Sequence, residues 1–251
     1  CSGSAPLQPR LAKVFTAAGM TIAEAYGLTE TSPAISVNDM RNKGLKIGTV
    51  GKIIDGVEVK IAQDGEIWCK GPNVMKGYYK SPELTAEVME GDFFKTGDIG
   101  EIDGDGFLKI TDRKKQMFKT SGGKYIAPQV IESELKQSLF IEQIVVVGEG
   151  KNMAAAIVQP HYEGSKNWLH KQGIVFDDNY EALSKNKKLI EHITAEIRLH
   201  DHKFGKWEQV KVVRLTPDVW SVEEGHLTPT MKVKRNEILR KYEKLIQEIY
   251  C

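Results

Sequence analysis

Apolar residues recur at helical spacing near both ends of the chain. Residues 9–19 carry an apolar position every three to four residues, with a proline near the start and a glycine just past the end, which predicts a short helix. Residues 234–250 place their apolar side chains on one stripe, which predicts a single amphipathic helix packed on the core. Both stripes indicate a chain that folds around a buried interior.

The middle of the chain has the two-residue period of β-strands. Residues 57–61 and 66–69 flank an Asp-Gly turn, and residues 101–102 and 107–110 flank another glycine turn, which predicts two hairpins. After Asp112 the pattern becomes mixed, with a helix from Pro128 through Lys136, strands at 144–147 and 154–158, and further helices. A second domain is therefore expected to begin near this point.

Composition narrows the class of protein. A length of 251 residues with 41% hydrophobic content is enough to bury a core. Lys and Arg total 35 against 34 Asp and Glu, so the formal charge of +1 gives no general attraction to nucleic acid, and we predict no nucleic-acid partner. No apolar run approaches the roughly 20 residues of a membrane span, and no basic and apolar leader opens the chain.

The cysteines indicate the cellular compartment, and the first residues indicate whether the chain is a fragment. The three cysteines are far apart and lack CxxC spacing, which argues against a disulfide framework or a zinc site and favours the cytoplasm. The chain opens without a methionine, which we interpret as the start of a fragment. Peripheral membrane contact and the oligomeric state are left open.

Two short strings could bind a nucleotide. Tyr26-Gly27 leads into Thr29-Glu30, where a hydroxyl and a carboxylate adjoin in a glycine turn and could hold a phosphate and its Mg²⁺. A capped turn is the simpler interpretation of these residues taken alone. Asp98, after a Thr-Gly turn, could accept two ribose hydroxyls while Arg113 donates to the same sugar.

Two further strings carry basic residues. Residues 112–128 lead from a basic run through Gly122-Gly123, where a backbone can pass close to a ligand, to the proline-started helix. Residues 227–235 form a polar loop with a proline that delivers Lys232 just before the terminal helix, and a lysine there can supply a mobile charge to an anion.

Together, in this order, the four strings resemble the signature of the adenylate-forming superfamily of acyl-CoA synthetases, peptide-synthetase adenylation domains and luciferases. YGLTET at 26–31, DRKK at 112–115 and LTPT-x-K-x-KR at 227–235 resemble the long-chain fatty acid–CoA ligases in particular. The resemblance implies two half-reactions: a fatty acid carboxylate attacks the α-phosphorus of ATP and releases pyrophosphate, and coenzyme A then attacks the acyl-adenylate and releases AMP.

The resemblance also assigns roles to residues. Thr29 and Glu30 would contact phosphate and Mg²⁺, and Lys232 would reach the α-phosphate and the substrate carboxylate. Lys115 falls at the hinge position. The remaining positions are implied to bind ATP, AMP or coenzyme A: the adenine and acyl turn Gly3, Ser4, Ala5 and Pro6, the residues Tyr26 and Gly27, the ribose ligands Asp98 and Arg113, and Gly122 and Gly123 beside the thiol tunnel.

The implied fold is α/β and α+β. Residues 1–39 would end a large N-terminal α/β lobe, 40–112 would form a small β subdomain, and 113–251 a mobile α+β lid. The family's phosphate loop, of the kind T-S-G-T-T-G-x-P-K-G, is not found in the sequence, so we expect this chain alone to be a poor catalyst. Two alternatives remain: an acid-activating enzyme that loads a carrier protein, and a non-catalytic nucleotide-binding module.

Overall fold

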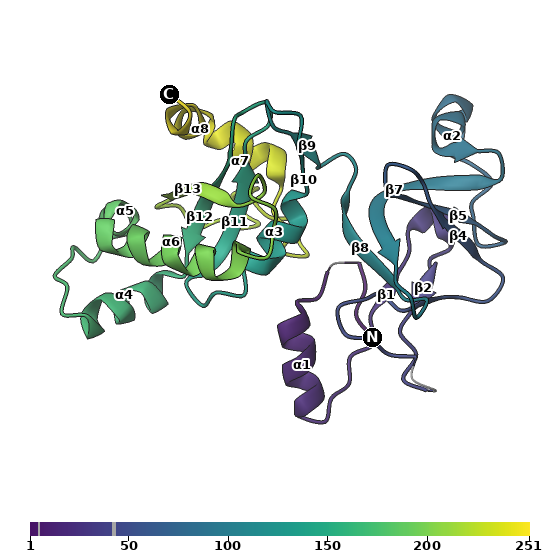
Figure 1. The fold of residues 1–251 in the computed structure, drawn as a ribbon, viewed down its shortest axis with the longest axis horizontal. Coiled ribbons are helices and arrows are strands. Elements are labelled where there is room, and N and C mark those ends of the chain that lie inside the picture. Colours follow the sequence, from purple (N-terminus) through teal and green to yellow (C-terminus); the bar gives the residue numbers. More distant parts are fainter. Residues whose placement is uncertain (5, 42–43) are drawn as a thin grey trace. The chain divides into compact units, whose positions relative to one another are not determined.

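The computed structural model describes residues 1–4, 6–41 and 44–251. The chain separates into two compact units, residues Cys1–Gln116 and Met117–Cys251 (Figure 1). Each unit has its own sheets and its own buried side chains, so each is described separately.

The first unit contains two antiparallel sheets. The small sheet has the order β1-β2-β3, and the larger has the order β4-β5-β7-β6 with β8 paired to β7. The elements are α1 (Pro9–Ala17), β1 (Ala25–Tyr26), the 3₁₀ helix η1 (Thr29–Thr31), β2 (Ser36–Val37), β3 (Lys52–Ile53), β4 (Glu58–Ile61), β5 (Glu66–Lys70), α2 (Pro82–Val88), β6 (Met89–Glu90), β7 (Phe93–Ile102) and β8 (Leu108–Arg113).

Local sequence signals explain most of this unit. The predicted helix is confirmed as α1, which has proline at its first turn and ends before Gly19, whose φ of 82° favours glycine. Both predicted hairpins are confirmed as β4–β5 and β7–β8. Their inward residues join one apolar cluster that includes Ile35, Ile67 and Leu108, all fully buried. This cluster fixes the register of the strands that carry the candidate site.

The second unit contains a mixed three-stranded sheet and a small hairpin. Strand β12 pairs antiparallel with β11 and parallel with β13, and β9 pairs with β10. The elements are β9 (Phe118–Lys119), β10 (Tyr125–Ile126), α3 (Pro128–Leu135), β11 (Ile141–Val147), β12 (Ala154–Pro160), α4 (Tyr162–Lys171), α5 (Tyr180–Lys185), α6 (Lys187–Asp201), β13 (Val210–Leu215), α7 (Arg235–Lys241) and α8 (Glu243–Ile249).

Both faces of this sheet are covered. Alternate residues of β11 and β12 fall into two separate apolar clusters, as the two-residue period of a strand requires. One cluster joins Val146 to buried side chains of α3 and α6, and the other joins Val145 to buried side chains of α7 and α8. The unit therefore has a sheet sandwiched between two helical layers, which explains the nearly continuous apolar runs in β11 and β12.

The single terminal helix predicted for residues 234–250 is wrong in one respect. The segment forms two helices, α7 and α8, that meet at Tyr242, where φ is −102° and ψ is 21°. The Tyr242 hydroxyl lies 2.6 Å from Thr216 Oγ1 and accepts a hydrogen bond of 3.0 Å from Trp220 Nε1. These buried contacts accompany the break, while the predicted apolar stripe does pack on the core.

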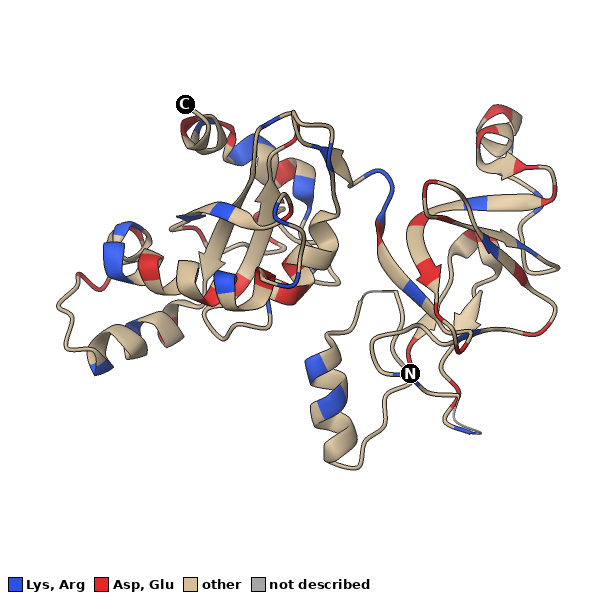
Figure 2. Cartoon of the chain, viewed as in Figure 1, with Lys and Arg blue, Asp and Glu red and all other residues tan. Residues whose placement is uncertain are grey.

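Basic and acidic residues are intermixed along both units (Figure 2). Within the described ranges, no helix is both long and apolar enough to cross a membrane.

Candidate functional site

Asp98 is the centre of a polar cluster in the first unit. It lies directly across from Arg113 in the β7–β8 register, and Arg113 Nε donates to Asp98 Oδ1 at 3.1 Å. Tyr26, from the small sheet, donates its hydroxyl hydrogen to Asp98 Oδ2 at 2.7 Å. The structure thus brings Tyr26 to Asp98 and Arg113, which the sequence analysis had already paired.

The electrostatics of the cluster follow from its burial. Asp98 is 4% exposed. Burial raises the pKa of its carboxyl, and the hydrogen bond from Tyr26 and the charge of Arg113 pull the pKa in the opposite direction. Burial and the Asp98 charge raise the pKa of the Tyr26 phenol, so Tyr26 stays a donor. An ionised carboxylate offers about four lone-pair positions, so Asp98 can still accept hydrogen bonds from a diol.

Glu66 holds the turn that carries Asp98. Its carboxylate accepts from the Gly97 N–H at 3.0 Å and from Lys114 Nζ at 2.8 Å. Hydrogen bonds to Asp64 and Glu66 raise the pKa of the Lys114 ammonium. Glu66, which is 4% exposed, was not identified from the sequence, because a glutamate in a strand resembles any surface residue.

The N-terminal turn lies beside the strand of Tyr26. The Ser2 N–H donates to Ala23 O at 2.8 Å, and the Ala25 N–H donates to Ser2 O at 2.9 Å, so the first residues run alongside β1. Gly3 faces Ala25 O, and Ser4 has a φ of 65°. Pro6 is exposed, and Ala5 lies outside the described residues.

Gly27 makes the next turn possible. A Cβ on Gly27 would lie 1.7 Å from Pro33 O, so only glycine fits. The chain then enters η1, where Thr29 is exposed. The Glu30 backbone carbonyl accepts from the Met75 N–H at 2.8 Å, which fastens η1 to a distant loop.

The Glu30 carboxylate has a partner that the sequence did not predict. Tyr78 donates its hydroxyl hydrogen to Glu30 Oε1 at 2.9 Å. No group of three or more metal-binding side chains occurs within the described residues. A single carboxylate nevertheless fits Mg²⁺ chemistry, since Mg²⁺ is commonly held by one or two carboxylates plus substrate phosphates. The Glu30 carboxylate is therefore compatible with a Mg²⁺ ion that is held mainly by substrate phosphates.

Gly122 and Gly123 lie in the β9–β10 hairpin of the second unit. Thr120 N–H donates to Lys124 O at 2.9 Å, and Gly123 N–H donates to Thr120 O at 2.9 Å, which closes the turn. Gly123 has a φ of 75°, a conformation that favours glycine. Both glycines are exposed, so the turn can approach a ligand.

Lys232 lies on a tight hairpin of the same unit. Leu227 and Val233 form an antiparallel bridge, and the Thr228 N–H donates to Lys232 O at 2.8 Å. The Thr228 hydroxyl accepts from the Lys232 N–H at 3.1 Å. The backbone of Lys232 is thereby fixed at an exposed position.

Lys115 lies in a turn closed by the Gln116 N–H, which donates to Arg113 O at 2.8 Å. This turn ends the first unit, whose last residue is Gln116.

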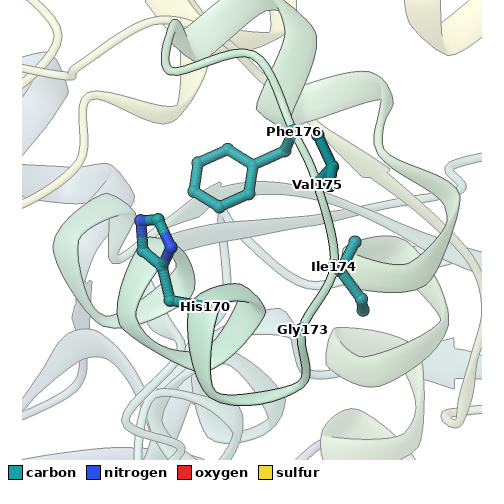
Figure 3. Close-up of a pocket in the computed structure, with 5 residues that line it drawn as sticks. All are labelled: His170, Gly173, Ile174, Val175 and Phe176. Atoms are coloured by element: carbon teal, nitrogen blue, oxygen red, sulfur yellow. The ribbon is translucent and has the colours of Figure 1, made fainter.

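A pocket of about 300 Å³ lies elsewhere in the second unit. It is lined by His170, Gly173, Ile174, Val175 and Phe176, at the end of α4 and the loop that follows (Figure 3). The His170 and Phe176 rings meet edge to face at 4.9 Å between centroids. None of the predicted site residues lines this pocket, so we assign it no role.

Two protein families together match most of the chain. Residues 115–251, more than half of it, match the family described as AMP-binding enzyme C-terminal domain. Residues 1–79 match the family described as AMP-binding enzyme.

Curated relatives match along nearly the whole chain. A long-chain-fatty-acid–CoA ligase, FadD15, of Mycobacterium tuberculosis is 38% identical over 99% of this chain and 41% of its own length. Long-chain-fatty-acid–CoA ligase 1 of Cavia porcellus is 37% identical over 99% of this chain and 37% of its own. The chain therefore spans about two fifths of the length of these relatives.

Solved structures confirm the predicted fold class. The A domain of a carboxylic acid reductase from Segniliparus rugosus, in complex with AMP and a co-purified carboxylic acid, superposes with a TM-score of 0.78 at 21% identity. The match covers 99% of this chain and 38% of that one. An ATP-bound RpMatB-BxBclM chimera gives a TM-score of 0.74 at 27% identity, over 96% of this chain and 45% of that one.

Proposed function

The chain belongs to the AMP-binding enzyme family, and we propose that it takes part in the ATP-dependent activation of a long-chain fatty acid and its transfer to coenzyme A. The observation that carries the proposal is the identity of 37–38% with long-chain-fatty-acid–CoA ligases over 99% of the chain. In the first step a fatty acid carboxylate forms a bond to the α-phosphorus of ATP and pyrophosphate leaves. In the second, the sulfur of coenzyme A bonds to the acyl carbon and AMP leaves.

The Asp98 cluster is proposed to hold the nucleoside. Asp98 would accept hydrogen bonds from the two ribose hydroxyls, while Arg113 donates to the same sugar. The phenol of Tyr26, which keeps Asp98 in place, and the turn from Gly3 to Pro6 would lie along the adenine and the acyl group. Support comes from the two fixed hydrogen bonds that orient the buried carboxylate.

Thr29 and Glu30 are proposed to contact the phosphates. The hydroxyl of Thr29 would donate to a phosphate oxygen, and Glu30 would be the protein ligand of a Mg²⁺ ion held mainly by ATP. When bound, that ion neutralises phosphate charge. The hydrogen bond from Tyr78 would orient the Glu30 carboxylate.

Lys232 is proposed to act in the adenylate-forming step. Two anions must meet there, and the ammonium of Lys232 would offset their repulsion and stabilise charge at the α-phosphate. Loss of such a contact costs on the order of 3 kcal/mol, or about a hundredfold in rate.

The thiol step requires a different lining, which Gly122 and Gly123 are proposed to supply. Lys115 would be the pivot between the two arrangements, a proposal supported by its place one residue before the end of the first unit. Lys115→Pro fixes φ and is expected to block one half-reaction while the other survives. If both half-reactions proceed at the original rates, Lys115 is not the pivot.

AMP release by the product of the complete gene tests the proposed function. The reaction would contain ATP, Mg²⁺, coenzyme A and fatty acids from short to long. We expect release that depends on coenzyme A and is fastest with long chains. Release that responds to a carrier protein instead of coenzyme A would identify a carrier-loading enzyme, and no release with any acid would overturn the proposal. The 251-residue chain alone, without the phosphate-loop string, should release AMP far more slowly.

A further inference from the structure

A largely buried ion pair joins two distant parts of the second unit. Glu132 lies in the middle of α3, and Arg235 is the first residue of α7. Arg235 Nη2 pairs with Glu132 Oε1, and the two side chains are only 14% and 15% exposed. They are 103 residues apart in sequence, so the pair reflects the tertiary fold.

The pair also provides hydrogen-bond partners for backbone groups at an edge of the sheet. Strand β11 is one of the two outer strands of the order β11-β12-β13, and Val146 turns its N–H and C=O away from β12. The Val146 N–H donates to Glu132 Oε1 at 2.7 Å, and Arg235 Nη1 donates to Val146 O at 2.8 Å. Glu132, Arg235 and the Val146 backbone thus form a closed three-way contact, which we name the edge clamp.

The edge clamp lies at the exit of the Lys232 hairpin. Arg235 follows Lys232 by three residues, and the Lys234 N–H donates to His226 O at 2.8 Å across the base of the hairpin. On the two flanks, Leu227 and Ile238 are buried in the apolar cluster on the α7 and α8 face of the sheet. Arg235 continues around the edge of β11 to reach Glu132 of α3.

We propose that Arg235, held by Glu132 and Val146, is a positioning residue that fixes the hairpin from which Lys232 acts in adenylate formation. This inference rests on the proposed role of Lys232. A lysine ammonium is a point charge on a flexible stem, and a fixed backbone limits the positions that this charge can take up. A misplacement of about 1 Å can cost roughly a hundredfold in rate.

The planar fork of arginine explains why this residue type is needed. One guanidinium donates to the Glu132 carboxylate and the Val146 carbonyl at once, whereas a lysine ammonium is a point charge on a flexible stem. Arg235→Lys therefore keeps the charge and loosens the clamp. Glu132→Gln keeps an acceptor for the Val146 N–H and removes the charge.

The test measures the two half-reactions separately in the product of the complete gene. We expect Arg235→Lys and Glu132→Gln to slow fatty acid-dependent pyrophosphate exchange by at least about tenfold, by analogy with the cost of misplacement. Thioester formation from supplied acyl-adenylate should stay within about twofold. Arg240→Lys, in the same helix but 73% exposed, is the matched control and should change neither rate. Circular dichroism confirms that each variant is folded.

A double variant that combines Arg235→Lys with Lys232→Ala tests the positioning role of Arg235 separately from the proposed role of Lys232. If Arg235 acts through Lys232, Arg235→Lys should slow exchange less than about twofold further in the Lys232→Ala background, because coupled residues are not additive. Equal loss of both half-reactions, an undiminished effect in the Lys232→Ala background, or no effect of Arg235→Lys would each overturn the inference. If Lys232→Ala itself leaves exchange unchanged, the proposed role of Lys232 is wrong.

Discussion

The phenol of Tyr78 donates a hydrogen bond of 2.9 Å to the carboxylate of Glu30, which lies 48 residues earlier in the chain. The contact fixes the direction of a side chain on a short 3₁₀ helix, whose backbone is itself fastened by the Met75 N–H. A carboxylate held in this way loses less freedom when it binds a cation than one that rotates freely.

Tyr78→Phe is expected to raise the Mg²⁺ concentration that the adenylate-forming step requires. Removal of the hydroxyl leaves the ring in place and frees Glu30 Oε1, so the Mg²⁺ concentration for half-maximal pyrophosphate exchange should rise on the order of tenfold. Tyr79→Phe is the control, because Tyr79 is the adjacent residue and is 87% exposed. The same Mg²⁺ dependence in both variants would contradict a positioning role for Tyr78.

Arg113→Lys is expected to raise the apparent KM for ATP about tenfold, which corresponds to about 1.4 kcal/mol. The substitution keeps a positive charge across from Asp98 but removes the Nε donor that contacts Asp98 Oδ1 at 3.1 Å. Arg41→Lys serves for comparison, since Arg41 pairs with Asp39 in an exposed loop. Steady-state kinetics over a range of ATP concentrations would decide, and an unchanged KM for Arg113→Lys would remove Arg113 from the ribose site.

Local patterns predicted what depends on neighbours in sequence. The hairpin that joins β7 to β8 follows from its glycine turn, whereas the register shift between Ile99 and Gly100, which sets Asp98 across from Arg113, does not follow from that turn. Helix α3 follows in the same way from the proline at its start.

Contacts between distant segments could not be read from these patterns. Tyr26 and Asp98 are 72 residues apart, and the partner of Glu30 is a tyrosine in a loop with no periodic signal. The break at Tyr242 was missed for the same reason, because its hydroxyl bonds to residues over 20 positions away. The division at residues 39/40 and 112/113 and the roles of the site residues stay predictions.

Gly27→Ala is expected to destabilise the first unit. The new methyl group would lie 1.7 Å from Pro33 O and 2.7 Å from Ala34 Cα, so the backbone must move. Overpacking of this kind costs about 1–3 kcal/mol, and a clash with backbone falls at the upper end.

Gly104→Ala provides the control for Gly27→Ala. A Cβ at Gly104 meets nothing within 4 Å, so the free energy of unfolding should change by no more than about 0.5 kcal/mol. Urea unfolding of both variants measures the difference. Similar values for the two would mean that the turn at Gly27 relaxes without cost.

His226 is expected to make stability depend on pH. It is 7% exposed at the base of the Lys232 hairpin, and its Nε2 lies 3.2 Å from Lys241 Nζ. Burial, and then the Lys241 charge, lower the pKa of His226, while Asp218 and Glu224 act in the opposite direction. A protonated His226 would turn an N–H donor toward the Lys241 ammonium, which is also a donor.

The sign of the effect follows from proton binding in the two states. An unfolded histidine has a pKa near 6.5. Below that value the unfolded chain binds a proton that folded His226 resists, so the free energy of unfolding falls with decreasing pH, by at most about 1.4 kcal/mol per unit.

His226→Gln should make the decline between about pH 7 and 5.5 shallower, while the exposed His170→Gln should keep it. Burial also lowers the pKa of His192, and because His192 is retained in both variants, the difference between them isolates His226. Urea unfolding at several pH values gives the slopes, and equal slopes in the two variants would mean that His226 takes up its proton as readily in the folded state as in the unfolded one.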